Sequence, residues 1–226
     1  MRRHALVTRI WHWINALAVV VLFMSGLNIS NAHRFLYWGD YGFDPADAWL
    51  SVMRFPAWAT IPQRYDLAEA RDWHNTFAWV FALGLLGMWI ASLANRHFQR
   101  DIAASASEWS PRSLLVDMRE HLRGHFDHGD GRYNSLQKIS YGLVLGVLLP
   151  LMIVTGLAIS PGIEPAMPWL VDALGGRQSA RSLHFLAAWA LFAFVAVHLV
   201  MVILSGPIRQ VAAMITGGPR GDAGNG

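Results

Sequence analysis

Four long apolar stretches constrain this chain more than any other feature of its sequence. A bilayer core about 30 Å thick is crossed by a helix of about 20 apolar residues. The stretches that meet this length cover residues 10–29, 73–94, 139–159 and 183–204. Charged residues make up 15% of the chain, whereas a soluble domain carries about 25%. The sequence therefore predicts an all-α integral membrane protein, a bundle of four spanning helices.

The segments around these stretches are polar. The N-terminal end resembles the start of a signal peptide, but its apolar run is too long and no small-residue cleavage site follows, so we expect a retained first span. Segment 46–55 has apolar residues at helical spacing and predicts a short interfacial helix. Segment 160–182, with three prolines and a glycine pair, predicts an irregular loop. We expect one domain over 1–216 and a disordered glycine-rich tail over 217–226.

The distribution of arginine and lysine predicts the orientation. Four spans place both termini on one side, and that side holds 12 of the 18 Arg and Lys residues, against six on the other. The positive-inside rule then places both termini in the cytoplasm of a bacterium, with the chain in its inner membrane. The net charge is +3, which we attribute to this topology and not to binding of nucleic acid.

Four histidines lie within or at the edges of the predicted spans: His12, His74, His184 and His198. A polar side chain at membrane depth costs several kcal/mol unless it is paired, and no Asp or Glu lies deep in a predicted span. Neutral imidazole is a good axial ligand for haem iron. The chain has no cysteine, which excludes covalently attached c-type haem, so the haem would be b-type. A packing role is the alternative for any single histidine.

The spacing of these histidines favours haem over packing. His184 and His198 are 14 residues apart, which places them on nearly the same helix face and about 21 Å apart along the axis. Because the spans alternate in direction, His12 falls at the depth of His198 and His74 at the depth of His184. We therefore predict the pairs His12–His198, near the cytoplasm, and His74–His184, near the outer surface. Each pair would hold one of two stacked haems between the helices.

Glycines and arginines follow the same spacing. Gly26 lies 14 residues after His12, and Gly142 and Gly156 are also 14 residues apart. We predict that these three glycines give the porphyrins clearance, with close helix packing as the alternative. Arg9 and Arg181 each precede a predicted ligand by three residues and share its helix face. They are predicted partners of the haem propionates, with a topological or snorkelling role as the alternative.

The other histidines carry no such pattern. Those between the second and third spans have the spacing of a helical metal pair, but a solvated polar face beside neighbouring charges explains them better: His121, His125 and His128. Three more flank the predicted spans: His4, His33 and His97. We assign none of them a site.

The N-terminal segment carries a family resemblance. Residues 7–15, VTRIWHWIN, resemble the opening of bacterial di-haem cytochrome b subunits, which serve nickel–iron hydrogenases, formate dehydrogenases and thiosulfate reductases and are related to bacterial cytochrome b-561. The resemblance covers essentially the whole chain. It implies haem ligands in the first, second and fourth spans, which are His12, His74, His184 and His198. It also implies electron transfer between a quinone pool and an extracytoplasmic partner, with the quinone near His12 and His198.

A second short segment resembles one branch of this family. Residues 35–42, FLYWGDYG, resemble the first outer loop of its thiosulfate-reductase-like members, which implies a periplasmic molybdopterin oxidoreductase as partner. The chain would then be an electron-transfer subunit that makes and breaks no substrate bond alone. Three alternatives stay open: a self-sufficient quinol oxidase that reduces a small acceptor such as superoxide, a transporter with a histidine proton relay, and a membrane anchor without a redox role.

Overall fold

The computed structural model describes residues 6–94, 139–140 and 142–217. Within them, three helices are long and apolar enough to cross a membrane: α1 (Leu6–Ala32), α2 (Leu67–Ala94) and α7 (Arg177–Leu204). They contain the first, second and fourth predicted spans. The chain is therefore a helical integral membrane protein.

The third predicted span, 139–159, is helical in its described part but shorter than the other three. A π-helical segment, η4 (Val144–Leu148), leads into α5 (Leu149–Ile159). Pro150 lies in the first turn of α5 and has no N–H to donate, which accounts for the wider turn just before it. Together they form a shorter apolar helix, so a bundle of four spanning helices stays a prediction.

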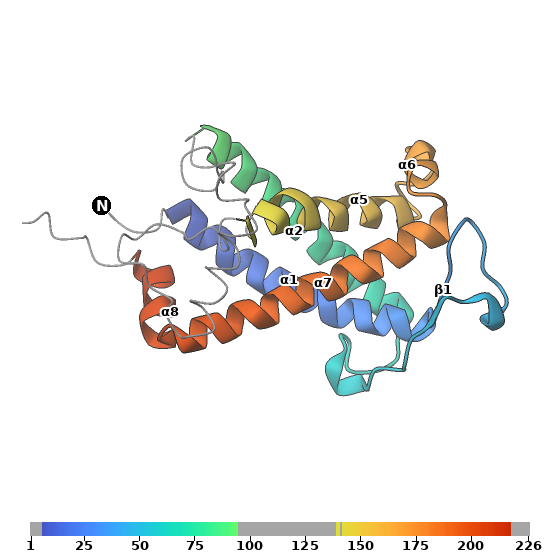
Figure 1. Cartoon of the computed structure of the whole chain (residues 1–226), viewed down its shortest axis with the longest axis horizontal. Coiled ribbons are helices and arrows are strands. Elements are labelled where there is room, and N and C mark those ends of the chain that lie inside the picture. Colours follow the sequence, from blue (N-terminus) through green and yellow to red (C-terminus); the bar gives the residue numbers. More distant parts are fainter. Residues whose placement is uncertain (1–5, 95–138, 141, 218–226) are drawn as a thin grey trace, which may run out of the picture.

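The helices associate as two pairs. α1 packs against α2, and α5 packs against α7 (Figure 1). The start of α1 and a further helix, α8 (Pro207–Thr216), lie at one end of the molecule, and α6 (Pro168–Ala173) lies at the other. Six buried apolar residues join the pairs at mid-height, and we call them the middle layer: Ala18, Phe81, Leu85, Val144, Leu149 and Leu191.

The predicted interfacial helix over 46–55 is wrong. A single 3-10 turn, η1 (Pro45–Asp47), is followed by β2 (Leu50–Ser51), which pairs antiparallel with β1 (Phe35–Leu36). The Trp49 N–H donates to the Leu36 carbonyl (3.0 Å), so this donor serves the hairpin and cannot serve a helix. Apolar spacing alone misses this long-range pairing.

The predicted irregular loop over 160–182 is also partly wrong. It contains α6, which begins at Pro168, a residue well suited to a first helical turn, and the first turn of α7. Gly176 precedes α7 with a φ of 102°, and a Cβ there would lie 2.5 Å from the Gly39 carbonyl oxygen. α8 is not among the predicted elements; it ends at Gly217 in a left-handed cap, and the rest of the predicted tail lies outside the described residues.

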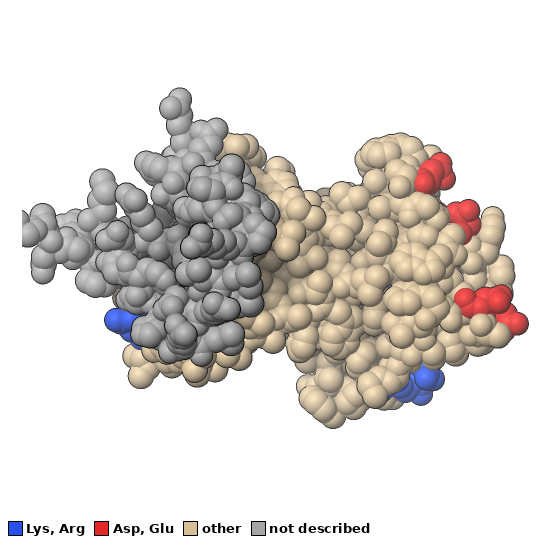
Figure 2. Space-filling view, in the orientation of Figure 1, with Lys and Arg blue, Asp and Glu red and all other residues tan. Residues whose placement is uncertain are grey.

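The outer end of the fold, by the predicted orientation, is rich in acidic side chains. On the face shown in Figure 2, Asp and Glu gather at the end that carries α6 and β1. One carboxylate on the outer side, that of Asp66, caps a helix by accepting the Glu69 N–H (3.0 Å) at the start of α2. That hydrogen bond, with the charge of Arg64, holds the pKa of Asp66 below its ordinary value.

Candidate functional site

The four predicted histidines lie in two facing pairs. The ring centres of His12 on α1 and His198 on α7 are 6.4 Å apart, and their planes differ by 58°. The ring centres of His74 on α2 and His184 on α7 are 6.2 Å apart, and their planes differ by 67°. Each pair therefore joins one helix of the α1/α2 pair to α7.

These distances fit one iron atom between each two rings. A metal–imidazole bond is about 2 Å long and a ring nitrogen lies about 1 Å from its ring centre, so two axial imidazoles on one iron have centres about 6 Å apart. A porphyrin supplies the other four ligands itself. Within the described ranges, no three His, Asp or Glu side chains are grouped to hold a metal ion directly. The donor set thus suits haem, and ligation by these residues stays a prediction.

The middle layer separates the two pairs. Leu191 lies halfway along α7 between His184 and His198, and it belongs to this buried apolar cluster. On the His198 side, the ring of Phe194 stacks on the imidazole at 6.2 Å. Apolar side chains from α1, α2, η4, α5 and α7 therefore lie between the two levels.

At the outer pair, a serine fixes the orientation of His74. Ser25 Oγ lies 2.9 Å from His74 Nδ1 and also 2.7 Å from the carbonyl of Val21, one turn back on α1. The hydroxyl has one hydrogen, which it donates to that carbonyl, so it accepts the N–H of His74 Nδ1. The tautomer assigned in this way leaves Nε2 of His74 with a free lone pair for a metal.

A threonine orients His184 in the same way. Thr155 Oγ1 lies 2.8 Å from His184 Nδ1 and 2.6 Å from the carbonyl of Leu151, one turn back on α5. Ser25 and Thr155 are both fully buried. Outer hydrogen-bond partners of this kind orient ligating histidines and raise their donor strength.

Glycine follows each of these hydroxyl residues. A Cβ at Gly26 would lie 3.6 Å from His74 Cε1, and a Cβ at Gly156 would lie 3.4 Å from His184 Cε1. A Cβ at Gly142 would meet nothing within 4 Å. Gly26 and Gly156 thus leave space beside the two histidines, Gly142 faces open space, and haem clearance by all three stays a prediction.

Sequence reasoning identifies these glycines but misses Ser25 and Thr155. The sequence does contain a signal for them. Gly26 and Gly156, the two glycines beside the outer pair, each follow a hydroxyl residue directly, on two different helices. A hydroxyl inside an apolar span needs an acceptor, and the preceding helical turn supplies one. This leaves the oxygen lone pairs available to a neighbouring imidazole.

The two predicted propionate arginines differ in their surroundings. Arg9 is buried, and its Nη1 donates to the Ile215 carbonyl (2.8 Å) at the C-terminal end of α8, where helix dipoles favour a cation. Its Nε has no hydrogen-bond partner among the described residues. Arg181 donates through Nη1 to Gln178 (2.9 Å). Both arginines keep donors for another acceptor, so their predicted role stays open. The histidines at 121, 125 and 128 lie outside the described residues.

Hydrogen bonds to the outer loops hold the ends of α7 and α1. Ser182 on α7 donates to the Tyr37 carbonyl (2.7 Å) and accepts from the Trp49 indole (3.0 Å). Asn28 on α1 donates to the carbonyls of Pro62 (3.1 Å) and Arg64 (2.7 Å). The hairpin thus fixes the end of α7 that carries His184. The loop before α2 fixes the end of α1 that faces His74.

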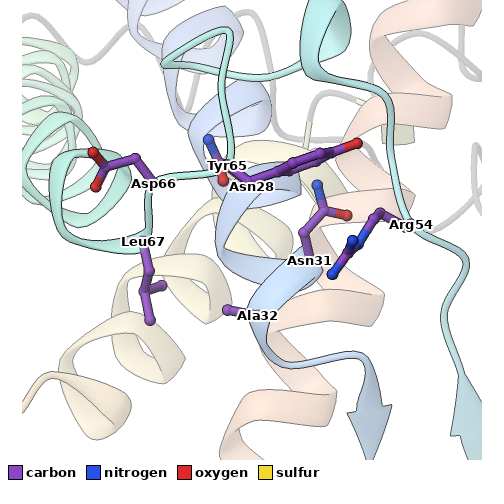
Figure 3. Close-up of a pocket in the computed structure, with 7 residues that line it drawn as sticks. All are labelled: Asn28, Asn31, Ala32, Arg54, Tyr65, Asp66 and Leu67. Carbon is purple, nitrogen blue, oxygen red and sulfur yellow. The ribbon is translucent and has the colours of Figure 1, made fainter.

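A small pocket of about 170 Å³ opens among these anchoring groups (Figure 3). Its lining residues come from α1, the following loop and the start of α2: Asn28, Asn31, Ala32, Arg54, Tyr65, Asp66 and Leu67. Asn31 is already bonded to both backbone groups of Phe55, and Arg54 lies over the Tyr65 ring at 5.0 Å. The polar groups of this pocket therefore serve the loop, and we assign it no ligand.

Long apolar helices with paired histidines at two levels define the class of membrane-embedded b-type cytochromes. Sequence comparison agrees: the chain belongs to the prokaryotic cytochrome b561 family, whose sequence profile matches residues 3–217. It is a membrane b-type cytochrome of electron transfer.

Two curated relatives match over most of their length. A protein of Azospira oryzae, named as a putative protein-methionine-sulfoxide reductase subunit YedZ1, is 30% identical over 92% of this chain and 93% of its own. A protein of Cupriavidus necator, named as a probable Ni/Fe-hydrogenase B-type cytochrome subunit, is 25% identical over 92% of this chain and 82% of its own. Both names describe subunits of oxidoreductases.

Proposed function

We propose that this cytochrome holds two haems and passes electrons across the bacterial inner membrane between a quinone pool and a periplasmic oxidoreductase. The observation that carries the proposal is the set of two imidazole pairs, with ring centres 6.4 and 6.2 Å apart, at two levels of one helix. Family membership supports b-type haem, and the paired geometry supports two of them.

Six polar side chains and the middle layer each have a defined role in this proposal. Haem bound at the two levels supplies reversible one-electron chemistry. His12 and His198 would hold the cytoplasmic group, and His74 and His184 would hold the outer group. Ser25 and Thr155 would keep Nδ1 of His74 and His184 protonated, which would leave Nε2 of each ring available to the metal. The middle layer places apolar side chains between the levels, and the protein would tune each potential through burial and nearby charge.

The partner is proposed on the outer side. By the predicted orientation, this side carries the hairpin segment 35–42 that resembles thiosulfate-reductase-like cytochromes. Both relatives are named as subunits of oxidoreductases, which supports a catalytic partner for this chain. We propose a molybdopterin-dependent oxidoreductase that docks at the outer loops. The quinone is proposed near His12 and His198.

Optical spectroscopy of the purified chain tests this function. We expect b-type bands on reduction and two haems per chain by pyridine haemochrome. His198→Ala should lose one haem and keep the other, because the outer pair remains intact. Unchanged haem content in all four single His→Ala variants would remove the basis of the proposal.

A further inference from the structure

Three basic residues lie near the outer ends of α1, α2 and α7. His33 follows the last residue of α1, and Arg71 and Arg181 lie in the second turns of α2 and α7. Arg71 Nη2 lies 3.3 Å from His33 Nε2. Arg181 precedes His184 by as many residues as Arg71 precedes His74, and its charge contributes to the lowered pKa of His33. We call these three residues the outer basic cluster.

No carboxylate is ion-paired with this cluster in the part of the chain that the structure describes. The ion pairs formed there use other cations: Arg64 with Asp66 and Glu69, and Arg177 with Glu164. Arg181 donates instead to the neutral amide of Gln178. Among the described residues, the two guanidinium groups of the cluster therefore form no ion pair.

The direction of the pKa shift of His33 is consistent with two positive charges near it. Its burial, followed by the charges of Arg181 and Arg71, lowers the pKa of His33. The lowered pKa keeps His33 neutral near pH 7, so the like charges are those of the two guanidinium groups, and an anion between them would relieve their repulsion. Guanidinium groups match a carboxylate well, because their N–H donors form a planar fork.

The position of the cluster indicates which anion it binds. Arg71 precedes His74 by three residues, and Arg181 precedes His184 by three. Each arginine therefore shares a helix face with one histidine of the outer pair and lies one turn nearer the surface. Haem carries two propionate carboxylates on one edge of its ring, and that edge can face outward from between the two imidazoles.

We propose that Arg71, Arg181 and His33 bind the propionate carboxylates of the outer haem. This proposal rests on the proposed function, in which His74 and His184 hold that haem. It adds Arg71 and His33 to Arg181, which the sequence already predicts as a propionate partner. A phospholipid phosphate could satisfy the same cations, but it would not account for their register with two haem ligands on two helices.

The test uses full-length chain prepared without haem and titrated with it, in a His12→Ala background that leaves the outer pair as the haem site. Arg71→Gln and Arg181→Gln should each weaken binding about 10-fold, by loss of a charge-assisted contact next to the ligands. Arg71→Lys and Arg181→Lys should keep most of the affinity, because the charge remains. Arg64→Gln is the matched control, since Arg64 lies on the same side but pairs with acidic residues.

A redox titration of the otherwise unmodified chain gives a second readout. Both Gln variants should lower the midpoint potential of one haem and leave the other unchanged, because a positive charge near one iron is lost. Equal potentials and affinities in the wild-type chain and the double Gln variant would overturn the proposal.

Haem dimethyl ester, in which both propionates are blocked, distinguishes between haem propionate and lipid phosphate as the bound anion. With this probe, the wild-type chain and the Gln variants should bind equally, and vesicles of neutral phosphatidylcholine should preserve the difference seen with ordinary haem. A Gln effect that persists with the ester, or that requires anionic lipid, would assign the cluster to lipid phosphate and overturn the proposal. Failure of the wild-type outer site to bind any haem would instead refute the proposed function.

Discussion

The hydrogen bonds of the outer histidines allow a quantitative prediction. Thr155→Val keeps the shape of the side chain but removes the oxygen that lies 2.8 Å from His184 Nδ1. Ser25→Ala removes the oxygen 2.9 Å from His74 Nδ1. Both hydroxyls are fully buried, so water will not easily replace them. Each change leaves a ligand imidazole less well oriented and less basic.

The expected size follows from the chemistry of outer-shell partners. Loss of such a partner typically costs about 10–100-fold in metal affinity, which is about 1.4–2.8 kcal/mol. Haem affinity at the outer site should fall by that factor in each variant. The midpoint potential of the outer haem should rise, because a weaker imidazole donor stabilises ferric iron less. Thr155→Ser and Ser25→Thr keep a hydroxyl at each position and should therefore have the wild-type haem affinity and midpoint potential.

The assay is haem titration of the apoprotein, followed by a redox titration of the loaded protein. Thr216→Val is the matched control: Thr216 makes the same hydrogen bond to the preceding turn (2.9 Å to the Ala212 carbonyl) but is exposed and lies on α8. It should behave as wild type. If Thr155→Val and Ser25→Ala both match this control in affinity and potential, the assigned tautomers and the role of the two hydroxyls are refuted.

Further predictions concern the ligands, the glycines and the loop anchor. His184→Ala should lose the outer haem and His198→Ala the cytoplasmic one, each halving the haem content by pyridine haemochrome; loss of both haems from each variant would contradict independent sites. Gly156→Leu should lower haem content, because a Cβ there would already lie 3.4 Å from the His184 ring. Asn28→Ala should lower the Tm in detergent and leave the haem stoichiometry unchanged. Asn28 is 2% exposed, and without its side chain two buried carbonyls lose their hydrogen-bond donor, which costs about 1–3 kcal/mol of stability. An unchanged Tm would show that the loop does not depend on this anchor.

The membrane-spanning character and the histidine positions can be predicted from the sequence, because both depend on local periodicity. Helix rise and rotation per residue are constants, so a 14-residue interval on an apolar segment fixes the face and depth of His184 relative to His198. Alternating span direction then brings His12 and His74 to the right depths. Family membership and three of the four spans are confirmed; haem ligation by these residues stays a prediction.

Long-range hydrogen bonds cannot be predicted in the same way. Segment 46–55 has helical apolar spacing, yet the Trp49 N–H bonds to a strand residue elsewhere in the loop. The contacts of Ser25 and Thr155 with histidines likewise join residues 49 and 29 positions apart. Arg71 is a different case. Its spacing to His74 matches that of the other arginines to their histidines, but a charge at a helix end also fits a purely topological role. Its contact with His33, 38 residues away, cannot be predicted from that spacing.

The central claim is that each pair of imidazoles holds one b-type haem. The most direct measurement is the haem content of the purified full-length chain, combined with a redox titration followed in the visible spectrum. We predict two haems per chain and two midpoint potentials, one of which is lost in His198→Ala. A folded chain with no haem, or with a single haem that survives each of the four His→Ala substitutions, would contradict it.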